Sequence, residues 1–288
     1  SGKRIIHMWT LPLPDDADRM SELLTALTYK NGNPKYALTQ DEKDKIETIY
    51  TLYHDRKATP CAEFLAEEIS DETQNAIKTA YSEVQINGRL STLRSRILLS
   101  SKKCPLCGIE SSTDLDHYLP ESIYKCLAVY SRNLIPTCHK CNNKKRAGVA
   151  ENGVGFIHVY YFDEPDGVFF VANTEMIDGA LVIDFNINMI EGMTREVYDS
   201  LCFQNRVVNL NERLKMEAND FLGGLYTSLE ETYNSAGQEG LRLFLKRTRD
   251  DYTRRYGLNH WRRALIDSLS DNVEFLDAGF ITALGTPE

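Results

Sequence analysis

Long hydrophobic runs are absent from this 288-residue sequence, and positively charged residues are in the minority. No stretch approaches the ~18 consecutive apolar residues that a membrane-spanning helix requires, and no secretory signal is recognisable. Asp and Glu number 42 against 33 Lys and Arg, which gives a formal net charge of −9. We therefore expect a cytoplasmic protein, and the composition argues against a uniformly basic nucleic-acid-binding protein.

The cysteines lack the even scatter of a disulfide framework. Four of the seven form two tight pairs, whereas Cys61, Cys126 and Cys202 stand alone. Paired Cys-x-x-Cys motifs indicate a metal site in a reducing compartment. Hydrophobic residues make up 42% and charged residues 26% of the chain, which is typical of a folded protein with a sizeable core.

The charge is unevenly distributed along the chain. Residues 1–100 and 151–288 are net acidic, by −2 and −11, whereas residues 101–150 carry a net charge of +4. An acidic surface is commonly solubilising, although it is also able to dock a basic partner. Because the distribution of charge bears more directly on nucleic-acid binding than the sum does, the central block is the region of interest.

Periodicity predicts a helical N-terminal region over residues 3–100. Thr39 begins a capping box in front of a helix that reaches about residue 54. Further apolar residues at helical spacing predict helices that begin at Pro60 and after Ser70.

The following segments change character. Residues 151–190 predict a small antiparallel β meander, because residues 156–162 are aromatic and β-branched and Asp-Gly pairs at residues 166–167 and 178–179 are hairpin-turn signals. Residues 191–288 are expected to be helical again, with breaks at glycines.

Two Cys-x-x-Cys motifs, Cys104/Cys107 and Cys138/Cys141, are separated by 30 residues within the basic block, residues 101–150. Four thiolates suit a tetrahedral Zn²⁺ at ~2.3 Å from each sulfur, and such a closed site is structural. Because so small a segment cannot form its own core, zinc binding is expected to be coupled to its folding. The alternative is four buried thiols without a metal.

Proton-transferring and amide side chains lie between and after these motifs. Asp116 and His117 end a predicted strand, Asn133 opens a second one, and Asn142 lies on a short basic helix directly after Cys141. The local order is therefore β–β–α. A regular strand would send the Asp116 and His117 side chains to opposite faces, and a bulge after Asp116 would bring both to one site.

The segments "CPLCG", "DLDHYLP" and "NLIPTCHKCNNKK" together resemble the HNH nuclease family, whose fold is a ββα-metal finger. The resemblance covers about residues 100–147. The wider arrangement, with a helical N-terminus and a "FIHVYYFD" strand after the finger, is similar to HNH proteins of bacterial anti-phage systems, such as the Septu-type nuclease that works beside an ATPase.

The resemblance implies a role for each motif residue. Asp116 and Asn142 would be the two protein ligands of a catalytic divalent ion, and His117 would be the general base that activates water. Asn133 would orient His117, and Asp114 would assist the ion without touching it. A neutral imidazole suits a base near pH 7, and an oxygen-rich site favours Mg²⁺ or Mn²⁺ over a second zinc.

Basic side chains around the finger would contact phosphates without reading sequence; they are Arg132, Lys140, Lys144, Lys145 and Arg146. The chain departs from the family pattern at Glu121, where a basic or neutral residue is usual. That acid would either weaken phosphate attraction or add a carboxylate to the metal.

Together these observations predict an α+β fold with four regions. A zinc-stapled ββα-metal HNH finger at residues 101–150 would be embedded between the helical N- and C-terminal regions, residues 3–100 and 191–288, with the small meander at residues 151–190.

The predicted function is a metal-dependent HNH endonuclease that hydrolyses phosphodiester bonds, with DNA the favoured nucleic-acid partner. The resemblance also implies an effector of anti-phage defence with a partner ATPase or sensor.

Three alternatives stay open. The enzyme could cleave RNA, including tRNA. The chain could instead be a non-catalytic zinc-finger nucleic-acid-binding or scaffold protein, or an interaction subunit that acts through its acidic C-terminal region. The stretch from Lys246 to Arg263, with seven basic and two acidic residues, would be either a second nucleic-acid surface or a solvated helix face that pairs with the protein's own acids.

Overall fold

The computed structural model describes residues 8–145 and 154–285, which belong to two compact units. The finger unit comprises Trp9–Pro105 and Glu110–Asp163, and the C-terminal unit comprises Leu106–Ile109 and the chain from Glu164 onward. The expected helical N-terminal region and the finger thus share one unit, because a single cluster of buried apolar side chains runs from Leu23 to Leu134. The fold is of mixed α+β type and mostly helical, with two small antiparallel hairpins.

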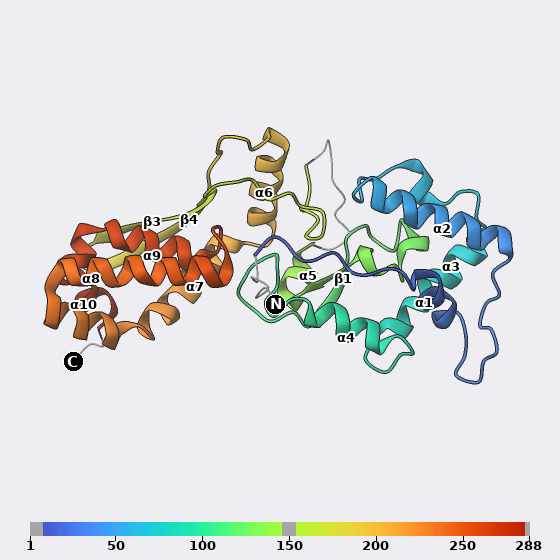
Figure 1. The fold of residues 1–288 in the computed structure, drawn as a ribbon, viewed down its shortest axis with the longest axis horizontal. Helices are drawn as coiled ribbons and strands as arrows, with labels where there is room; N and C mark the ends of the chain where they lie inside the picture. The colour runs from blue at the N-terminus through green and yellow to red at the C-terminus, as the bar shows by residue number, and fades with distance from the viewer. Residues whose placement is uncertain (1–7, 146–153, 286–288) are drawn as a thin grey trace. The chain divides into compact units, whose positions relative to one another are not determined.

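Among the described residues of the finger unit, the regular elements are helices and one hairpin, joined by irregular segments (Figure 1). Its elements are α1 Arg19–Ala26, α2 Gln40–Asp55, η1 Ala62–Leu65, α3 Asp71–Ala80, η2 Tyr81–Val84, α4 Ser91–Leu99, β1 Asp114–His117, η3 Lys125–Leu127, η4 Ser131–Asn133, β2 Leu134–Thr137 and α5 His139–Lys145.

The capping box predicted at Thr39 is confirmed and begins α2. The Thr39 hydroxyl accepts a hydrogen bond from the Glu42 backbone N–H at 3.2 Å, and the Glu42 carboxylate accepts one from the Thr39 N–H at 2.8 Å. Two of the backbone donors that every helix start leaves unpaired are thereby satisfied. One face of the helix is buried, and it carries Tyr50 and Tyr53 into the core.

Two sequence expectations in this unit are wrong. The helix expected from Pro60 is only the short 3₁₀ segment η1, which ends where Ala66 takes a left-handed conformation with φ of 55°. The "FIHVYYFD" segment is not a strand. The segment is irregular and largely buried, and its backbone groups form isolated hydrogen bonds instead of a strand ladder. For example, the Leu11 N–H donates to the Val159 carbonyl at 2.8 Å.

The C-terminal unit combines the second hairpin with helices. Its elements are β3 Phe170–Ile177, β4 Ala180–Ile187, α6 Arg195–Val207, α7 Leu210–Gly223, α8 Tyr226–Tyr256, α9 Trp261–Asp271, the π-helical η5 Phe275–Gly279 and α10 Phe280–Leu284. Figure 1 shows α8 and α9 side by side, and α9 also contacts β3.

The turn signal at Asp178-Gly179 is confirmed. Both residues have positive φ, 51° and 80°, and they join β3 to β4 in an antiparallel pair. This twist matches that of the flanking strands. The expected meander is a two-stranded hairpin, because residues 156–162 add no strand and the pair at residues 166–167 does not join two strands. Within the described residues, no helix is both long and apolar enough to span a bilayer.

We expect the Thr39→Ala variant to lower the free energy of unfolding by ~1 kcal/mol, because it removes the α2 cap. The matched control is Thr48→Ala, an exposed threonine inside α2 whose hydroxyl only donates to the Asp44 carbonyl. That change should be neutral or slightly stabilising, since alanine is the better helix former. Urea unfolding followed by circular dichroism measures both, and equal effects would contradict the capping argument.

Candidate active site

The finger has the β–β–α order predicted from the sequence. Strands β1 and β2 pair antiparallel, with Asp114 opposite Thr137 and His117 opposite Leu134. Helix α5 follows β2 at once and contacts β1 (Figure 1). The pairing is regular through His117, so no bulge interrupts the strand in which Asp116 and His117 lie.

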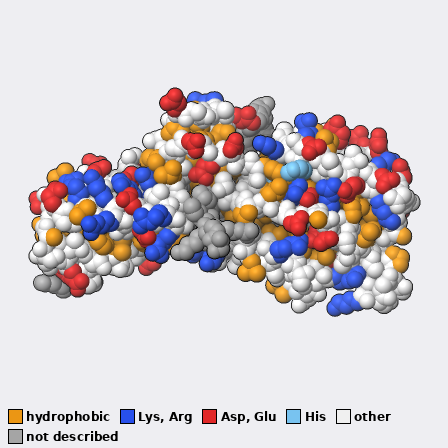
Figure 2. Space-filling model, viewed as in Figure 1, with side chains coloured by type: hydrophobic (Ala, Val, Ile, Leu, Met, Phe, Trp, Pro, Cys, Tyr) orange, Lys and Arg blue, Asp and Glu red, His pale blue; other side chains and the backbone are white. Residues whose placement is uncertain are grey.

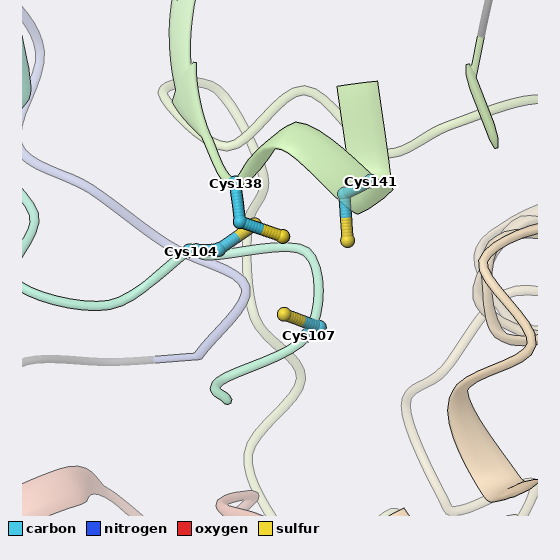
Figure 3. Close-up of side chains that lie close together, drawn as sticks. All are labelled: Cys104, Cys107, Cys138 and Cys141. Atoms are coloured by element: carbon cyan, nitrogen blue, oxygen red, sulfur yellow. The ribbon is translucent and has the colours of Figure 1, made fainter. Parts of the chain in front are cut away.

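Four buried cysteines come together at the base of this hairpin. The sulfur atoms of Cys104, Cys107, Cys138 and Cys141 all lie within 4.8 Å of one another, and Figure 3 shows their side chains converging. Cys138 directly precedes α5 and Cys141 lies in its first turn. The backbone N–H of Cys104 donates to the Glu110 carbonyl at 2.8 Å, which closes the first loop. This cluster is consistent with a structural Zn²⁺.

Contacts within the C-terminal unit hold the loop that carries Cys107. The Trp261 indole N–H donates to the Gly108 carbonyl at 3.2 Å, and Arg213 Nη2 donates to the Cys107 sulfur at 3.6 Å. A cationic donor at a cysteine sulfur favours the thiolate form that a metal requires. No local sequence pattern signals either partner, since both follow the motif by more than a hundred residues.

Asp116 projects toward α5 and is paired there with Lys145. Its carboxylate is buried, and its Oδ2 lies 2.9 Å from the Lys145 ammonium. Lys145 also donates to the carbonyls of His117, at 2.7 Å, and Tyr118, at 3.3 Å. Burial raises the pKa of Asp116 above its usual value, although Lys145 acts in the opposite direction.

Asp114 lies two residues earlier on β1 and also meets α5, as strand alternation requires. Its Oδ2 accepts hydrogen bonds from Asn142, at 3.2 Å, and from His139, at 2.9 Å. Burial works to raise the pKa of Asp114, but these two hydrogen bonds hold it below its usual value. The structure therefore joins Asn142 to Asp114, whereas the sequence paired Asn142 with Asp116.

His117 is held by the loop between the strands. Its Nε2 lies 2.9 Å from the Ala128 carbonyl, and because a carbonyl only accepts, Nε2 carries the hydrogen and Nδ1 keeps the lone pair. Burial lowers the pKa of His117 to about 4, so the ring is neutral at pH 7. Tyr81 packs edge-on against the ring at 4.3 Å, and Glu121 Oε2 lies 3.5 Å from Nε2.

Glu121 and Asp116 both act on Tyr81. Burial is the main cause that raises the pKa of the Tyr81 phenol, and the negative charges of Glu121 and Asp116 add to it. Burial also raises the pKa of Glu121 itself. Glu121, the position at which the sequence departs from the HNH pattern, thus lies beside the His117 imidazole, and its carboxylate adds negative charge there.

Asn133 is fully buried and clamps the loop that carries the His117 partner. Its Oδ1 accepts from the Leu119 N–H at 2.8 Å, and its Nδ2 donates to the carbonyls of Leu119, at 3.0 Å, and Leu127, at 3.2 Å. Leu119 follows His117 by two residues, and Leu127 precedes Ala128. Asn133 thus fixes the backbone on both sides of the imidazole.

Two buried residues that the sequence did not single out join this network. The Tyr53 hydroxyl lies 3.0 Å from Asn133 Oδ1 and 3.0 Å from His158 Nε2. Tyr53 comes from α2 and His158 from the irregular segment after the finger. The sequence pattern around each of them predicts only that it is buried. Tyr53 is on the apolar face of its helix, and His158 lies among aromatic residues.

The residues expected to contact phosphates differ in their availability. Lys144 is exposed, and the largely exposed Lys140 pairs with Glu110 at 2.7 Å. Arg132 instead binds Asp16 at 2.7 Å. Lys145, only 4% exposed, is occupied by Asp116, so its ammonium is not presented to a phosphate as the sequence predicted. Arg146 lies outside the described residues.

The basic stretch from Lys246 to Arg263 pairs largely with acids of its own unit. Arg249 and Arg263 contact Asp267, both at 3.1 Å, and Arg254 and Arg255 contact Asp251, at 3.4 and 2.6 Å. Figure 2 shows Lys and Arg interspersed with Asp and Glu over α8 and α9. These ion pairs favour the solvated, self-paired helix over a second nucleic-acid surface.

The side of β1 that faces α5 fits a divalent ion chemically. Asp114, Asp116 and Asn142 supply oxygen donors there, the type that Mg²⁺ and Mn²⁺ prefer. Asp116 Oδ2 is buried and lies 2.9 Å from the Lys145 ammonium. A divalent ion at this carboxylate would therefore replace that ammonium or share the carboxylate with it.

Comparison with known proteins gives one distant similarity. The chain is 25% identical to protein ea31 of Escherichia phage lambda over 202 residues, which cover 62% of this chain. The chain spans 65% of the length of that relative. No family model matches the chain, and no solved structure gives a significant match.

We expect the pH dependence of stability to report the burial of His158, whose pKa burial lowers to about 3. The imidazole of the unfolded chain has a pKa of ~6.5 and takes up its proton first as the pH falls. Wild type should therefore lose up to ~1.4 kcal/mol per pH unit below that value, relative to a His158→Gln variant, which cannot titrate. Urea unfolding between pH 7.5 and 5 measures the difference, and parallel curves would contradict it.

Proposed function

We propose that this chain is a metal-dependent HNH endonuclease that hydrolyses phosphodiester bonds, with DNA the expected substrate. The observation that carries the proposal is the state of His117. The ring is buried and neutral, its Nε2–H is fixed on the Ala128 carbonyl, and Nδ1 is left as its proton acceptor. His117 follows Asp116 on β1 of a β–β–α finger, with its side chain on the opposite face of the strand, and the second strand leads into the four-cysteine cluster.

The residues then divide the work of hydrolysis. His117 Nδ1 removes a proton from a water molecule, and the water oxygen attacks the phosphorus as the bond to the 3′ oxygen breaks. The leaving 3′ oxygen takes a proton from a second water molecule, which gives a 5′-phosphate and a 3′-hydroxyl. Asp116, Asn142 and Asp114 would hold Mg²⁺ or Mn²⁺. When bound, such an ion offsets the charge that develops on the leaving oxygen. Lys140 and Lys144 would position the backbone phosphates.

The proposal extends to a partner and a second metal. A structural Zn²⁺ in the four-cysteine cluster would hold α5 against the hairpin, and the resemblance to anti-phage proteins supports an effector that acts beside a partner ATPase or sensor. RNA, including tRNA, stays an alternative substrate, because phosphate contacts and a single metal do not distinguish the sugars.

A non-catalytic zinc-bound nucleic-acid-binding protein is the competing function. The observation in its favour is the pair of Lys145 and Asp116, because an ammonium at 2.9 Å neutralises the carboxylate without any divalent ion. Asp114 is also occupied within the protein, since its Oδ2 accepts hydrogen bonds from Asn142 and His139. A cleavage assay separates the two functions.

We expect cleavage of plasmid DNA that requires Mg²⁺ or Mn²⁺ and falls by at least ~100-fold in His117→Ala, because general-base catalysis contributes on that order. The matched control is His54→Ala, which changes a half-buried histidine of α2 whose ring meets Tyr161. Total tRNA is assayed in parallel, so that the substrate cut decides between DNA and RNA. Equal cleavage by wild type and folded His117→Ala would exclude this active site.

We expect one zinc per purified chain. Cys107→Ser should remove it and lower the free energy of unfolding by about 4 kcal/mol or more, since losing a structural metal is among the most destabilising changes. Cys202→Ser is the matched control, because Cys202 is half-buried in α6, outside the cluster. Metal analysis and thermal unfolding measure both, and a metal-free, fully stable wild type would contradict the zinc site.

A further inference from the structure

A directed chain of hydrogen bonds runs through the core of the finger unit and ends at Asn133. The Tyr160 backbone N–H donates to His158 Nδ1 at 3.3 Å, so the hydrogen of the neutral ring is on Nε2. Nε2 then donates to the Tyr53 oxygen at 3.0 Å, and the Tyr53 hydroxyl donates to Asn133 Oδ1 at 3.0 Å. The Tyr53 hydroxyl also lies 3.4 Å from the Arg132 carbonyl, so Asn133 Oδ1 is its nearer acceptor, and the shorter contacts give the chain one consistent direction.

Asn133 uses its whole hydrogen-bonding capacity in this arrangement. Its Nδ2 donates twice, to the Leu119 and Leu127 carbonyls, and its Oδ1 accepts twice, from the Leu119 N–H and from Tyr53. The carbonyl acceptors fix which end of the amide is nitrogen. The Tyr53 hydroxyl supplies the one bond that comes from outside the finger, and it opposes rotation of the amide away from Leu127.

We infer that Tyr53 and His158 are positioning residues for His117, acting through Asn133 and the loop that it clamps. Asn133 holds Leu127, the next residue is Ala128, and the Ala128 carbonyl fixes the His117 Nε2–H. The orientation of the imidazole thus depends on an amide that Tyr53 and His158 secure. This inference rests on the proposed nuclease function only for its effect on rate.

Neighbouring tyrosines provide an internal comparison. Tyr161 packs against both Tyr53 and His158, with ring centroids 6.3 and 4.7 Å away, but its hydroxyl meets His54 instead of Asn133. Tyr161→Phe therefore removes a hydroxyl from the same aromatic cluster without touching the chain of hydrogen bonds. Tyr53→Phe keeps the ring and its packing but deprives Asn133 Oδ1 of one donor.

The first test uses the full, zinc-loaded chain with Mn²⁺ and plasmid DNA. Tyr53→Phe should lower kcat by about 10- to 100-fold with KM unchanged, as loss of a supporting hydrogen bond behind a reactive group does. Tyr161→Phe should keep the wild-type kcat. His158→Gln, which is able to accept and donate as His158 does, should retain far more activity than His158→Leu.

The second test does not depend on activity. In the same chain labelled with ¹⁵N-histidine and ¹⁵N-asparagine, NMR reports the tautomer of His117 and the hydrogen exchange of the Asn133 side-chain amide. Tyr53→Phe should speed that exchange and mix the His117 tautomers, whereas Tyr161→Phe should leave both signals unchanged.

The outcomes separate the two claims. A wild type that cleaves nothing but shows the NMR changes in Tyr53→Phe alone supports the positioning role and counts against the nuclease. Wild-type NMR signals in Tyr53→Phe overturn the positioning role even if the enzyme is active. Equal losses in Tyr53→Phe and Tyr161→Phe overturn it as well, because they show a packing effect.

Discussion

The arrangement of the finger depends on the pairing of polar groups that are buried in it. Asp116, His117, Asn133 and Lys145 are each less than 10% exposed, and an unpaired polar group at such depth costs about 1–3 kcal/mol. The Asn133 amide meets this constraint by bonding on both sides of the loop between β1 and β2. That clamp holds the loop, and through it the Ala128 carbonyl that His117 contacts.

Burial also sets the charge state of the site. Burial lowers the pKa of His117 to about 4 and raises the pKa of Asp116. It therefore favours the neutral imidazole and the neutral carboxyl group. The positive charge of Lys145 acts to lower both pKa values, which favours the charged carboxylate of Asp116 and the neutral ring of His117. The result is a neutral imidazole on one face of β1 and, on the opposite face, a carboxylate that is paired with a cation.

Short sequence motifs correctly predicted helix starts and turns at positions where the chemistry of one or two residues determines the backbone conformation. Thr39 and Ser70 begin α2 and α3 because their hydroxyls cap backbone N–H groups. Asp178-Gly179 forms the β3–β4 turn because glycine tolerates positive φ. Residues 156–162 were misjudged as a strand, since aromatic and β-branched composition measures the ability to be buried, and tertiary packing decided the backbone there.

By itself, the sequence determined that two cysteine pairs would lie on either side of a β–β pair, the second of them at the start of the following helix, because ligand spacing and hydrophobic period are local properties. It also singled out His117 and Asn133 as candidate site residues. Only the tertiary structure decided that Asn142 meets Asp114, that Lys145 is buried on Asp116, and that Tyr53 and His158 reach Asn133. These contacts join residues between 28 and 105 positions apart. They are set by the packing of distant segments, which no local pattern encodes.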